Sequence, residues 1–167
     1  YTKYEDVSEI VSAFTASSSE KLRKQNSHSN LVMVFVRTNY FRKDQPQYAR
    51  NIVIKTDYPT SSYIELNRYA QIGLKKIFKS GYQYKKAGVI LMGISTDNST
   101  QLSLFELPNP KHRILMRTMD RLNQSIGSTK VMFAGQSLDR KWKMKQERLS
   151  PYFTTKIKDV IKIKLSE

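Results

Sequence analysis

The chain contains no cysteine, which excludes a disulfide framework, a thiol nucleophile and a zinc ribbon. No apolar run approaches the roughly 18 residues that a transmembrane helix requires, and the first residues do not resemble a secretory signal. We therefore expect a cytoplasmic protein. Histidine is scarce too, since His28 and His112 stand far apart without a companion set of ligands. The sequence thus indicates no metal site and no catalytic residue.

Acidic residues are also in short supply. The 167 residues include 14 Asp and Glu against 29 Lys and Arg, which gives a formal net charge of +15. The excess is distributed, because residues 1–95 hold 15 basic and 7 acidic side chains and residues 96–167 hold 14 and 7. Positive charge spread over a folded domain is typical of a protein that binds nucleic acid. No basic helix carries a broad apolar face, so we expect no membrane partner.

The first part of the sequence predicts a helix followed by two strands. Thr2 and Glu5 have the spacing of a capping box, and an apolar stripe with helical periodicity follows them. The stripe consists of Val7, Ile10, Val11, Phe14 and Leu22. Residues 31–37 and 51–56 are rich in β-branched side chains and predict two strands. The short connection between them indicates an antiparallel hairpin.

A second helix is predicted beyond Pro59, which would stop the preceding strand. Ser62 and Glu65 form another capping box, and Gly81 is placed to cap the C-terminal end. The apolar face of this helix consists of Leu66, Tyr69, Ala70, Gly73, Leu74 and Ile77. Residues 87–94 predict a third strand. The order predicts an α+β fold in which two helices cover one face of a small antiparallel sheet.

The remainder of the chain predicts a small mixed unit. Pro110 opens a helix that Gly127 closes, and residues 130–134 have the composition of a short strand. The apolar residues of that helix are Ile114, Leu115, Met119, Leu122 and Ile126. We therefore divide the chain into a domain at residues 1–95, a linker at 96–107 and a C-terminal unit at 108–167.

Alternation along the predicted strands separates an apolar face from a basic one. Val34 and Val36 would point toward the helices, so that Arg37 points the other way. The candidate DNA-binding residues on the outer face and at its margins are Arg37, Lys43, Arg50, Lys55, Lys85, Lys86 and Gly88. Gly88 is included because a residue without a side chain would let a phosphate approach the backbone N–H. Such phosphate contacts position nucleic acid without reading its sequence.

Four stretches of the sequence, taken in order, resemble one family. They are 84–89 (YKKAGV), 101–105 (QLSLF), 119–123 (MDRLN) and a group made of 133–136 (FAGQ), 142–145 (WKMK) and 149–155 (LSPYFTT). They closely resemble the C-terminal part of UmuC-type catalytic subunits of bacterial DNA polymerase V, in the Y family of translesion polymerases. The resemblance extends over nearly the whole chain.

The resemblance implies a division of labour. Residues 1–95 would be the little finger, the domain with which these error-prone polymerases of the SOS response grip primer–template DNA at the nucleoid. Residues 108–167 would be the region that the family associates with UmuD′ and RecA. The palm domain with its Mg²⁺-binding carboxylates has no counterpart in this sequence. We therefore expect the chain to need no cofactor of its own and to be inactive as a polymerase alone.

The linker carries a peptide of the kind that bacterial replication proteins use to hold the ring-shaped sliding clamp. Leu104 and Phe105 would fill a hydrophobic groove, and Gln101 would hydrogen-bond at its rim. Leu102 would add contact, and Ser103 would face solvent. Burying each of the two anchors is worth roughly 1.5–3 kcal/mol before the cost of association.

Two other functions remain open, a free-standing nucleic-acid-binding module and a protein-interaction adaptor whose charge is incidental. An RNA-recognition sheet would need aromatic residues among the basic ones, and only Phe35 has such a place. The pattern also yields three strands, whereas the little finger has four. If the first strand is absent, the exposed sheet edge favours an edge-to-edge dimer.

Overall fold

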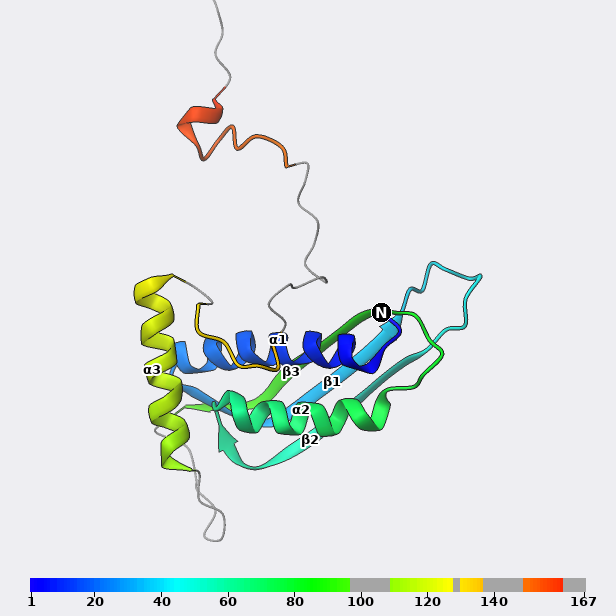
Figure 1. The fold of residues 1–167 in the computed structure, drawn as a ribbon, viewed down its shortest axis with the longest axis horizontal. Helices are drawn as coiled ribbons and strands as arrows, with labels where there is room; N and C mark the ends of the chain where they lie inside the picture. The colour runs from blue at the N-terminus through cyan, green and yellow to red at the C-terminus, as the bar shows by residue number, and fades with distance from the viewer. Residues whose placement is uncertain (97–108, 128–129, 137–148, 161–167) are drawn as a thin grey trace, which may run out of the picture.

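The computed structural model describes residues 1–96, 109–127, 130–136 and 149–160. Its elements are α1 (Tyr4–Lys24), β1 (Ser27–Thr38), β2 (Ala49–Thr60), α2 (Tyr63–Ile77), β3 (Tyr84–Thr96), α3 (Pro110–Ile126) and the short 3₁₀ helix η2 (Ile157–Asp159). The fold is α+β, and the three predicted strands are all present (Figure 1). Within the described ranges, no helix is long and apolar enough to cross a membrane.

The sheet is antiparallel, with β1 in the centre and the order β2-β1-β3. Its strands are longer than predicted, and β2 continues through Pro59 to Thr60. Pro59 is tolerated because β2 is an edge strand, where one missing N–H costs little. At the start of β3, Tyr1 and Tyr84 exchange two backbone hydrogen bonds of 2.9 and 2.8 Å.

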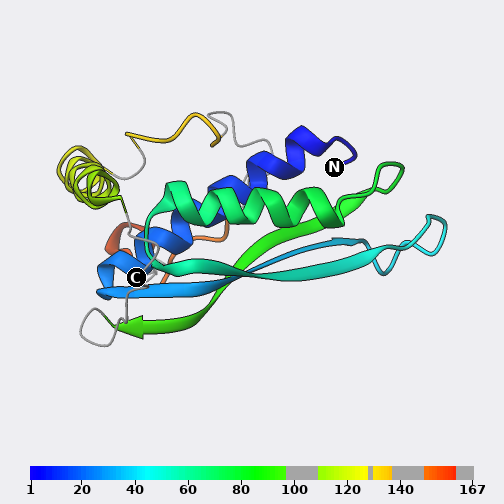
Figure 2. The same cartoon turned by 90° about the horizontal axis from the view of Figure 1, so that it is seen from below.

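Both long helices lie on the same face of the sheet, and no described helix covers the other face (Figure 2). The core between the two layers is built from valine on β1 and from apolar side chains of both helices. It contains Val7, Val11, Leu22, Val32, Val34, Val36, Leu66, Tyr69, Ala70, Leu74, Ile77 and Tyr84. The predicted alternation of β1 is therefore confirmed, with Val32, Val34 and Val36 turned toward the helices.

The predicted apolar face of α2 is buried along its whole length. At Gly73, an added Cβ would come within 3.1–3.2 Å of Val34, Ile52 and Ile54, so the missing side chain lets α2 lie close to the sheet. The stripe of α1 was predicted less well, because Phe14 is 39% exposed. Thr15 is buried instead, and its hydroxyl donates to the carbonyl of Val11 at 2.7 Å.

The side-chain hydrogen bonds predicted for the capping boxes of α1 and α2 do not form, and the predicted C-terminal cap of α2 is wrong. α1 begins after Lys3 without a side-chain cap, so Thr2 and Glu5 form no capping box. Ser62 is the N-cap residue of α2, but its hydroxyl makes no capping bond. Gly81 does not close α2, which ends four residues earlier at Ile77. With φ of +90°, Gly81 instead allows the turn into β3.

α3 begins and ends as predicted but packs through a different face. The side chain of Asn109 accepts a hydrogen bond from the backbone N–H of Lys111, Pro110 follows as the first helical residue, and Gly127 caps the end. Met116 is the one described residue of α3 that is fully buried. The predicted stripe is largely exposed, with Ile114 at 67% and Ile126 at 61%. The predicted strand at 130–134 is wrong, because these residues form bends, irregular backbone and the start of a turn.

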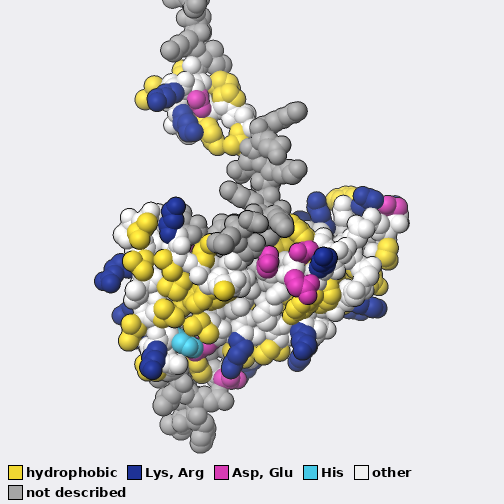
Figure 3. All heavy atoms as spheres, in the orientation of Figure 1, with side chains coloured by type: hydrophobic (Ala, Val, Ile, Leu, Met, Phe, Trp, Pro, Cys, Tyr) yellow, Lys and Arg dark blue, Asp and Glu magenta, His cyan; other side chains and the backbone are white. Residues whose placement is uncertain are grey.

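Figure 3 shows how the two kinds of surface are distributed on the helix side of the molecule. Hydrophobic side chains gather beside α3, where Leu115 and Leu122 are 41% and 37% exposed. Lys and Arg side chains stand around the rim and on the β1–β2 hairpin (Figure 3). Positive charge is therefore not uniform over this face, and the hairpin end of the sheet is one of the places where it collects.

Candidate nucleic-acid interface

The strand register brings two of the predicted DNA-binding residues together on the open face of the sheet. Arg37 on β1 lies directly opposite Lys86 on β3, and both side chains are exposed. Their neighbours Val36 and Ala87 pack into the core, so Arg37 and Lys86 point away from the helices. Residues paired across an antiparallel sheet have Cβ atoms about 5 Å apart. Two adjacent cations at this spacing favour an anionic ligand.

Three more of the predicted residues lie at the same end of the sheet. Arg50 is opposite Val36, which faces the helices, so Arg50 lies on the helix side of β2 and not on the open face predicted for it. Its guanidinium lies 5.9 Å from the centre of the Tyr48 ring. Lys85 is exposed at the register shift that begins β3, and Lys43 is exposed in the β1–β2 hairpin. We call Arg37, Lys43, Lys85 and Lys86 the basic end of the sheet, and Arg50 is left out because it faces the helix layer.

Lys55 is not part of this cluster. It pairs with Leu31, six residues along β1 from Arg37, which corresponds to about 20 Å of strand. Between the two positions the outer face is mostly apolar, with Val53 and Ile90 both opposite Met33. These two side chains are 48% and 45% exposed. The outer face is therefore basic at one end and hydrophobic in its centre, a division that single-strand alternation did not reveal.

The reason for including Gly88 is wrong. Gly88 is buried, and an added Cβ would lie 2.8 Å from Cζ of Phe35, its partner across β1 and β3. The aromatic ring therefore covers the space through which a phosphate was expected to approach. Gly88 accommodates Phe35, and cross-strand packing of an aromatic ring over glycine stabilises the sheet.

A second basic surface lies at the opposite end of the molecule and was missed by sequence reasoning. A groove of about 1170 Å³ runs between α3 and the adjoining ends of α1, β1 and α2. Arg113, Arg117 and Arg121 line it at intervals of one helical turn, and Lys24 and His28 lie on its other wall. The spacing of the three arginines was the available signal, because residues four apart share a helix face.

Contacts between α1 and α3 close one side of this groove. Arg23 donates from Nε and Nη2 to the two carboxylate oxygens of Asp120 at 2.6 and 2.7 Å. Its Nη1 also donates to the carbonyl of Ser61 at 2.9 Å. Both side chains are mostly buried, at 15% and 22% exposure. A two-bonded guanidinium–carboxylate pair fixes orientation as well as distance, so it holds α3 in place.

A buried carboxylate forms the second contact of α3. Glu65 accepts a 2.5 Å hydrogen bond from the hydroxyl of Tyr58, and Nδ1 of His112 lies 3.0 Å from the same oxygen. Burial, together with the hydrogen bond to Glu65, raises the pKa of Tyr58, so this hydroxyl remains a donor at neutral pH. Glu65 and His112 therefore join α2 to α3, and Glu65 has no capping role.

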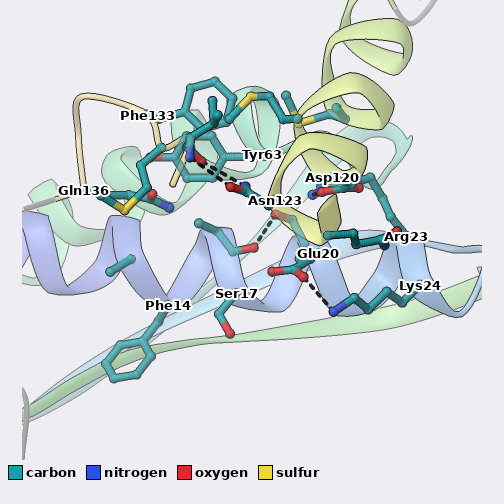
Figure 4. A pocket seen from close by; sticks show the side chains of 18 residues that line it. Phe14, Ser17, Glu20, Arg23, Lys24, Tyr63, Asp120, Asn123, Phe133 and Gln136 are labelled. Atoms are coloured by element: carbon teal, nitrogen blue, oxygen red, sulfur yellow. Dashed lines mark hydrogen bonds and ion pairs between the residues drawn. The ribbon is translucent and has the colours of Figure 1, made fainter. Parts of the chain in front are cut away.

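A smaller cavity of about 470 Å³ lies between α1, α3 and residues 131–136 (Figure 4). The amide side chain of Asn123 binds both backbone groups of Val131, at 3.0 and 2.8 Å. Phe133 stacks on Tyr63, with ring centres 4.2 Å apart. Figure 4 shows these groups, together with the exposed Glu20–Lys24 ion pair, facing the same space. The cavity belongs to the packing of α3 against α1.

Within the ranges that the structure describes, no three His, Asp or Glu side chains lie close enough to hold a metal ion. His28 lines the groove and His112 contacts Glu65, so the two histidines have different surroundings. The clamp-binding peptide formed by Gln101, Leu102, Ser103, Leu104 and Phe105 lies outside the described residues.

Comparison with known proteins identifies the family. Residues 1–104 match the C-terminal domain of the impB/mucB/samB family. The chain belongs to this family. Residues 113–163, which include most of α3, match a domain of unknown function, DUF4113. The impB/mucB/samB match begins at Tyr1 and covers α1, α2 and the whole sheet.

Three relatives show how far the similarity extends. Protein UmuC of Salmonella typhimurium is 33% identical over 165 residues, which is 98% of this chain and 39% of UmuC. Protein ImpB of Salmonella typhimurium is 36% identical over 91% of this chain and 36% of its own length. Protein MucB of Escherichia coli is 32% identical over 90% of this chain and 36% of its own length.

The chain thus spans less than half of the length of each relative. No solved structure matches it. The resemblance to UmuC-type Y-family polymerases is confirmed, and it extends through α3 into the C-terminal unit.

Proposed function

We propose that this chain is the DNA-gripping and clamp-tethering part of an error-prone translesion DNA polymerase. Membership of the impB/mucB/samB family supports a role in DNA repair with DNA as the partner. The observation that carries the proposal is the register of β1 and β3, which sets Arg37 opposite Lys86 on the open face of the sheet. Residues 1–95 would act as the little finger.

The basic end of the sheet suits a grip that ignores sequence. Lys and Arg side chains neutralise phosphates, and phosphate contacts position a protein without reading bases. A polymerase that copies past a damaged base needs this kind of contact, because the damaged base itself offers no standard hydrogen-bond pattern. The polymerase chemistry, with its Mg²⁺ ions, would be supplied by the palm domain of the polymerase.

The clamp peptide would supply the second attachment. Leu104 and Phe105 are its anchors, and a linear peptide of this length binds with about micromolar affinity. Surface plasmon resonance on the bacterial sliding clamp should show such binding, and Leu104→Ala/Phe105→Ala should abolish it. Substituting Ser103 with Ala is the matched control and should leave the affinity unchanged. UmuD′ and RecA are the partners proposed for residues 108–167.

DNA binding is tested with two double variants that remove equal charge. Arg37→Ala/Lys86→Ala alters the open sheet face, and Lys75→Ala/Lys76→Ala alters exposed residues of the helix layer. Fluorescence anisotropy with a labelled primer–template should show a loss on the order of tenfold for the first variant, because two solvent-exposed ion pairs with phosphate disappear, each worth roughly 0.2–1 kcal/mol. The second variant should bind like the parent. An equal loss in both would mean that the charge acts non-specifically.

A protein-interaction adaptor is the second candidate, and the apolar centre of the outer face favours it. Val53 and Ile90 are about half exposed on either side of Met33, and exposed apolar patches often mark protein contacts. This function predicts that DNA binding is absent or independent of salt. It also predicts that Val53→Ser/Ile90→Ser, rather than Arg37→Ala/Lys86→Ala, abolishes binding to the protein partner.

A further inference from the structure

The tip of the β1–β2 hairpin presents two large aromatic side chains to solvent. Tyr40 is 82% exposed and Phe41 is 88% exposed. Their ring centres lie 5.9 Å apart in an edge-to-face arrangement. Aromatic side chains bury 150–250 Å² in cores and interfaces, so a pair left in water indicates a surface that is covered by a ligand.

The loop that carries this pair is held by hydrogen bonds. The side-chain oxygen of Asn39 accepts from the backbone N–H of Phe41 at 3.3 Å, and its carbonyl accepts from the N–H of Arg42 at 3.0 Å. Gln47 donates from its amide to the carbonyl of Arg42 at 2.7 Å. The aromatic pair therefore stands on a defined loop, which lowers the entropy cost of binding.

The base of the loop is closed as well. Thr38 donates its hydroxyl to the side-chain oxygen of Gln47 at 2.8 Å, and the same hydroxyl accepts from the N–H of Tyr48 at 3.1 Å. The hairpin extends beyond the ends of both helices, as Figures 1 and 2 show from two directions. Tyr40 and Phe41 are thus carried away from the core, to a place where a ligand lying along the sheet can reach them.

The charges around the tip favour an anionic ligand. Between residues 37 and 50 there are four basic side chains, Arg37, Arg42, Lys43 and Arg50, and one acidic side chain, Asp44. Arg42 neutralises Asp44 through a two-bonded ion pair, with its Nη2 2.7 Å from Oδ2 and its Nε 3.0 Å from Oδ1. Exposed rings flanked by unneutralised cations are the combination found in sites for single-stranded nucleic acid.

We propose that Tyr40 and Phe41 stack on unpaired bases of the DNA whose backbone is held by the basic end of the sheet. This inference rests on the proposed DNA grip and deepens it, because it specifies which part of the DNA the hairpin contacts. Bases in a duplex are already stacked, whereas an unpaired base has a free face that an aromatic ring covers. Every base has such a face, so the contact adds preference for single strands without adding sequence specificity.

The test uses the whole chain and three DNA substrates that differ only in what they offer the rings. The first is a blunt duplex, and the second is the same duplex with a single-stranded extension. The third is that duplex with an extension of equal length built from abasic sugar phosphates. The variant is Tyr40→Leu/Phe41→Leu, which keeps apolar bulk but removes the ring faces. Affinity is measured by anisotropy, and base stacking by quenching of 2-aminopurine placed in the extension.

We expect the parent protein to prefer the normal extension over the abasic one by roughly 5- to 100-fold, since stacking on each base is worth about 1–3 kcal/mol. The leucine variant should lose this preference and the quenching, while its affinity for the blunt duplex is unchanged.

Equal affinity of the parent protein for both extensions would overturn the inference, even if Arg37→Ala/Lys86→Ala still weakened duplex binding. Absence of binding to all three substrates would overturn the DNA grip as well. A third outcome would also overturn the inference and would assign the hairpin to a membrane surface. In it, the unmodified protein and the leucine variant bind anionic vesicles equally well, and neither prefers the normal extension over the abasic one.

Discussion

Residues 1–96 and helix α3 are stabilised by different kinds of interaction. Residues 1–96 share one hydrophobic core between two helices and a sheet. α3 contributes a single buried side chain, Met116, and is attached mainly through Arg23–Asp120 and Glu65–His112. The first part therefore has the characteristics of an independent domain, and α3 has those of an element docked on it.

The stability of residues 1–96 and the attachment of α3 therefore depend on different interactions. Hydrophobic burial is non-directional and supplies most of the stability of a domain, whereas hydrogen bonds and ion pairs add a modest net energy but fix geometry. We therefore expect α3 to open at a lower free energy than the core. The proposed DNA-binding surface on the sheet belongs to the stable part, and the arginine-lined groove depends on the attached part.

The largest effect is expected in the core. Leu66→Ala should lower the free energy of unfolding by about 2–5 kcal/mol, because Leu66 is fully buried between α2 and the sheet. Urea denaturation followed by circular dichroism measures this. Leu115→Ala, at an exposed position of α3, is the control and should have little effect. Similar losses for both would show that α3 belongs to the same cooperative unit.

An intermediate effect is expected where α3 is attached. Arg23→Ala should destabilise the docking of α3 by roughly 1–3 kcal/mol, because Asp120 is left partly buried without its partner. Hydrogen exchange should accelerate in the amides of α3 while those of α2 keep their protection. Equal acceleration in both helices would contradict a separate attachment and place Arg23 among the residues that stabilise the core.

A smaller effect is expected at the turn after α3. Asn123→Ala should release the backbone of Val131, at a cost of about 1 kcal/mol for its neutral hydrogen bonds. Exchange of the Val131 amide is the measurement. Ser125→Ala removes only an exposed hydroxyl and serves as the control. If both substitutions leave that amide protected, the Asn123 contacts do not hold residues 130–136.

No measurable effect is expected at the exposed ion pair of α1. Glu20→Ala removes the partner of Lys24, but both side chains are about half exposed and solvent screens their attraction. The unfolding midpoint in urea should match that of the parent protein. A clear loss of stability would show that the cavity beside α3 depends on Glu20.

The layout of residues 1–96 could be predicted because its signals are local. Alternating valines in β1 and the apolar face of α2 are read from neighbouring residues, and both were confirmed. The same kind of prediction was wrong at Phe14, which is exposed, whereas Thr15 is buried. Thr15 can face the core because its hydroxyl donates a hydrogen bond to the Val11 carbonyl within α1. Hydrophobicity alone does not include that local hydrogen bond.

Features that depend on distant partners could not be predicted. Arg23 and Asp120 are 97 residues apart in sequence, and nothing near either position indicates the pair. Glu65 has the spacing of a capping box, yet Tyr58 and His112 take its carboxylate. At the candidate interface, the pairing of Arg37 with Lys86 and the covering of Gly88 by Phe35 both follow from strand register, which the sequence left open.

The salt dependence of DNA binding tests the phosphate grip most directly. Plotting the logarithm of the affinity against the logarithm of salt concentration gives a slope that grows with the number of phosphates neutralised. We predict that Arg37→Ala/Lys86→Ala reduces this slope by about 2, roughly one for each phosphate that is no longer neutralised, while Lys75→Ala/Lys76→Ala leaves it unchanged. An unchanged slope in the first variant would show that the basic end of the sheet does not hold the DNA backbone.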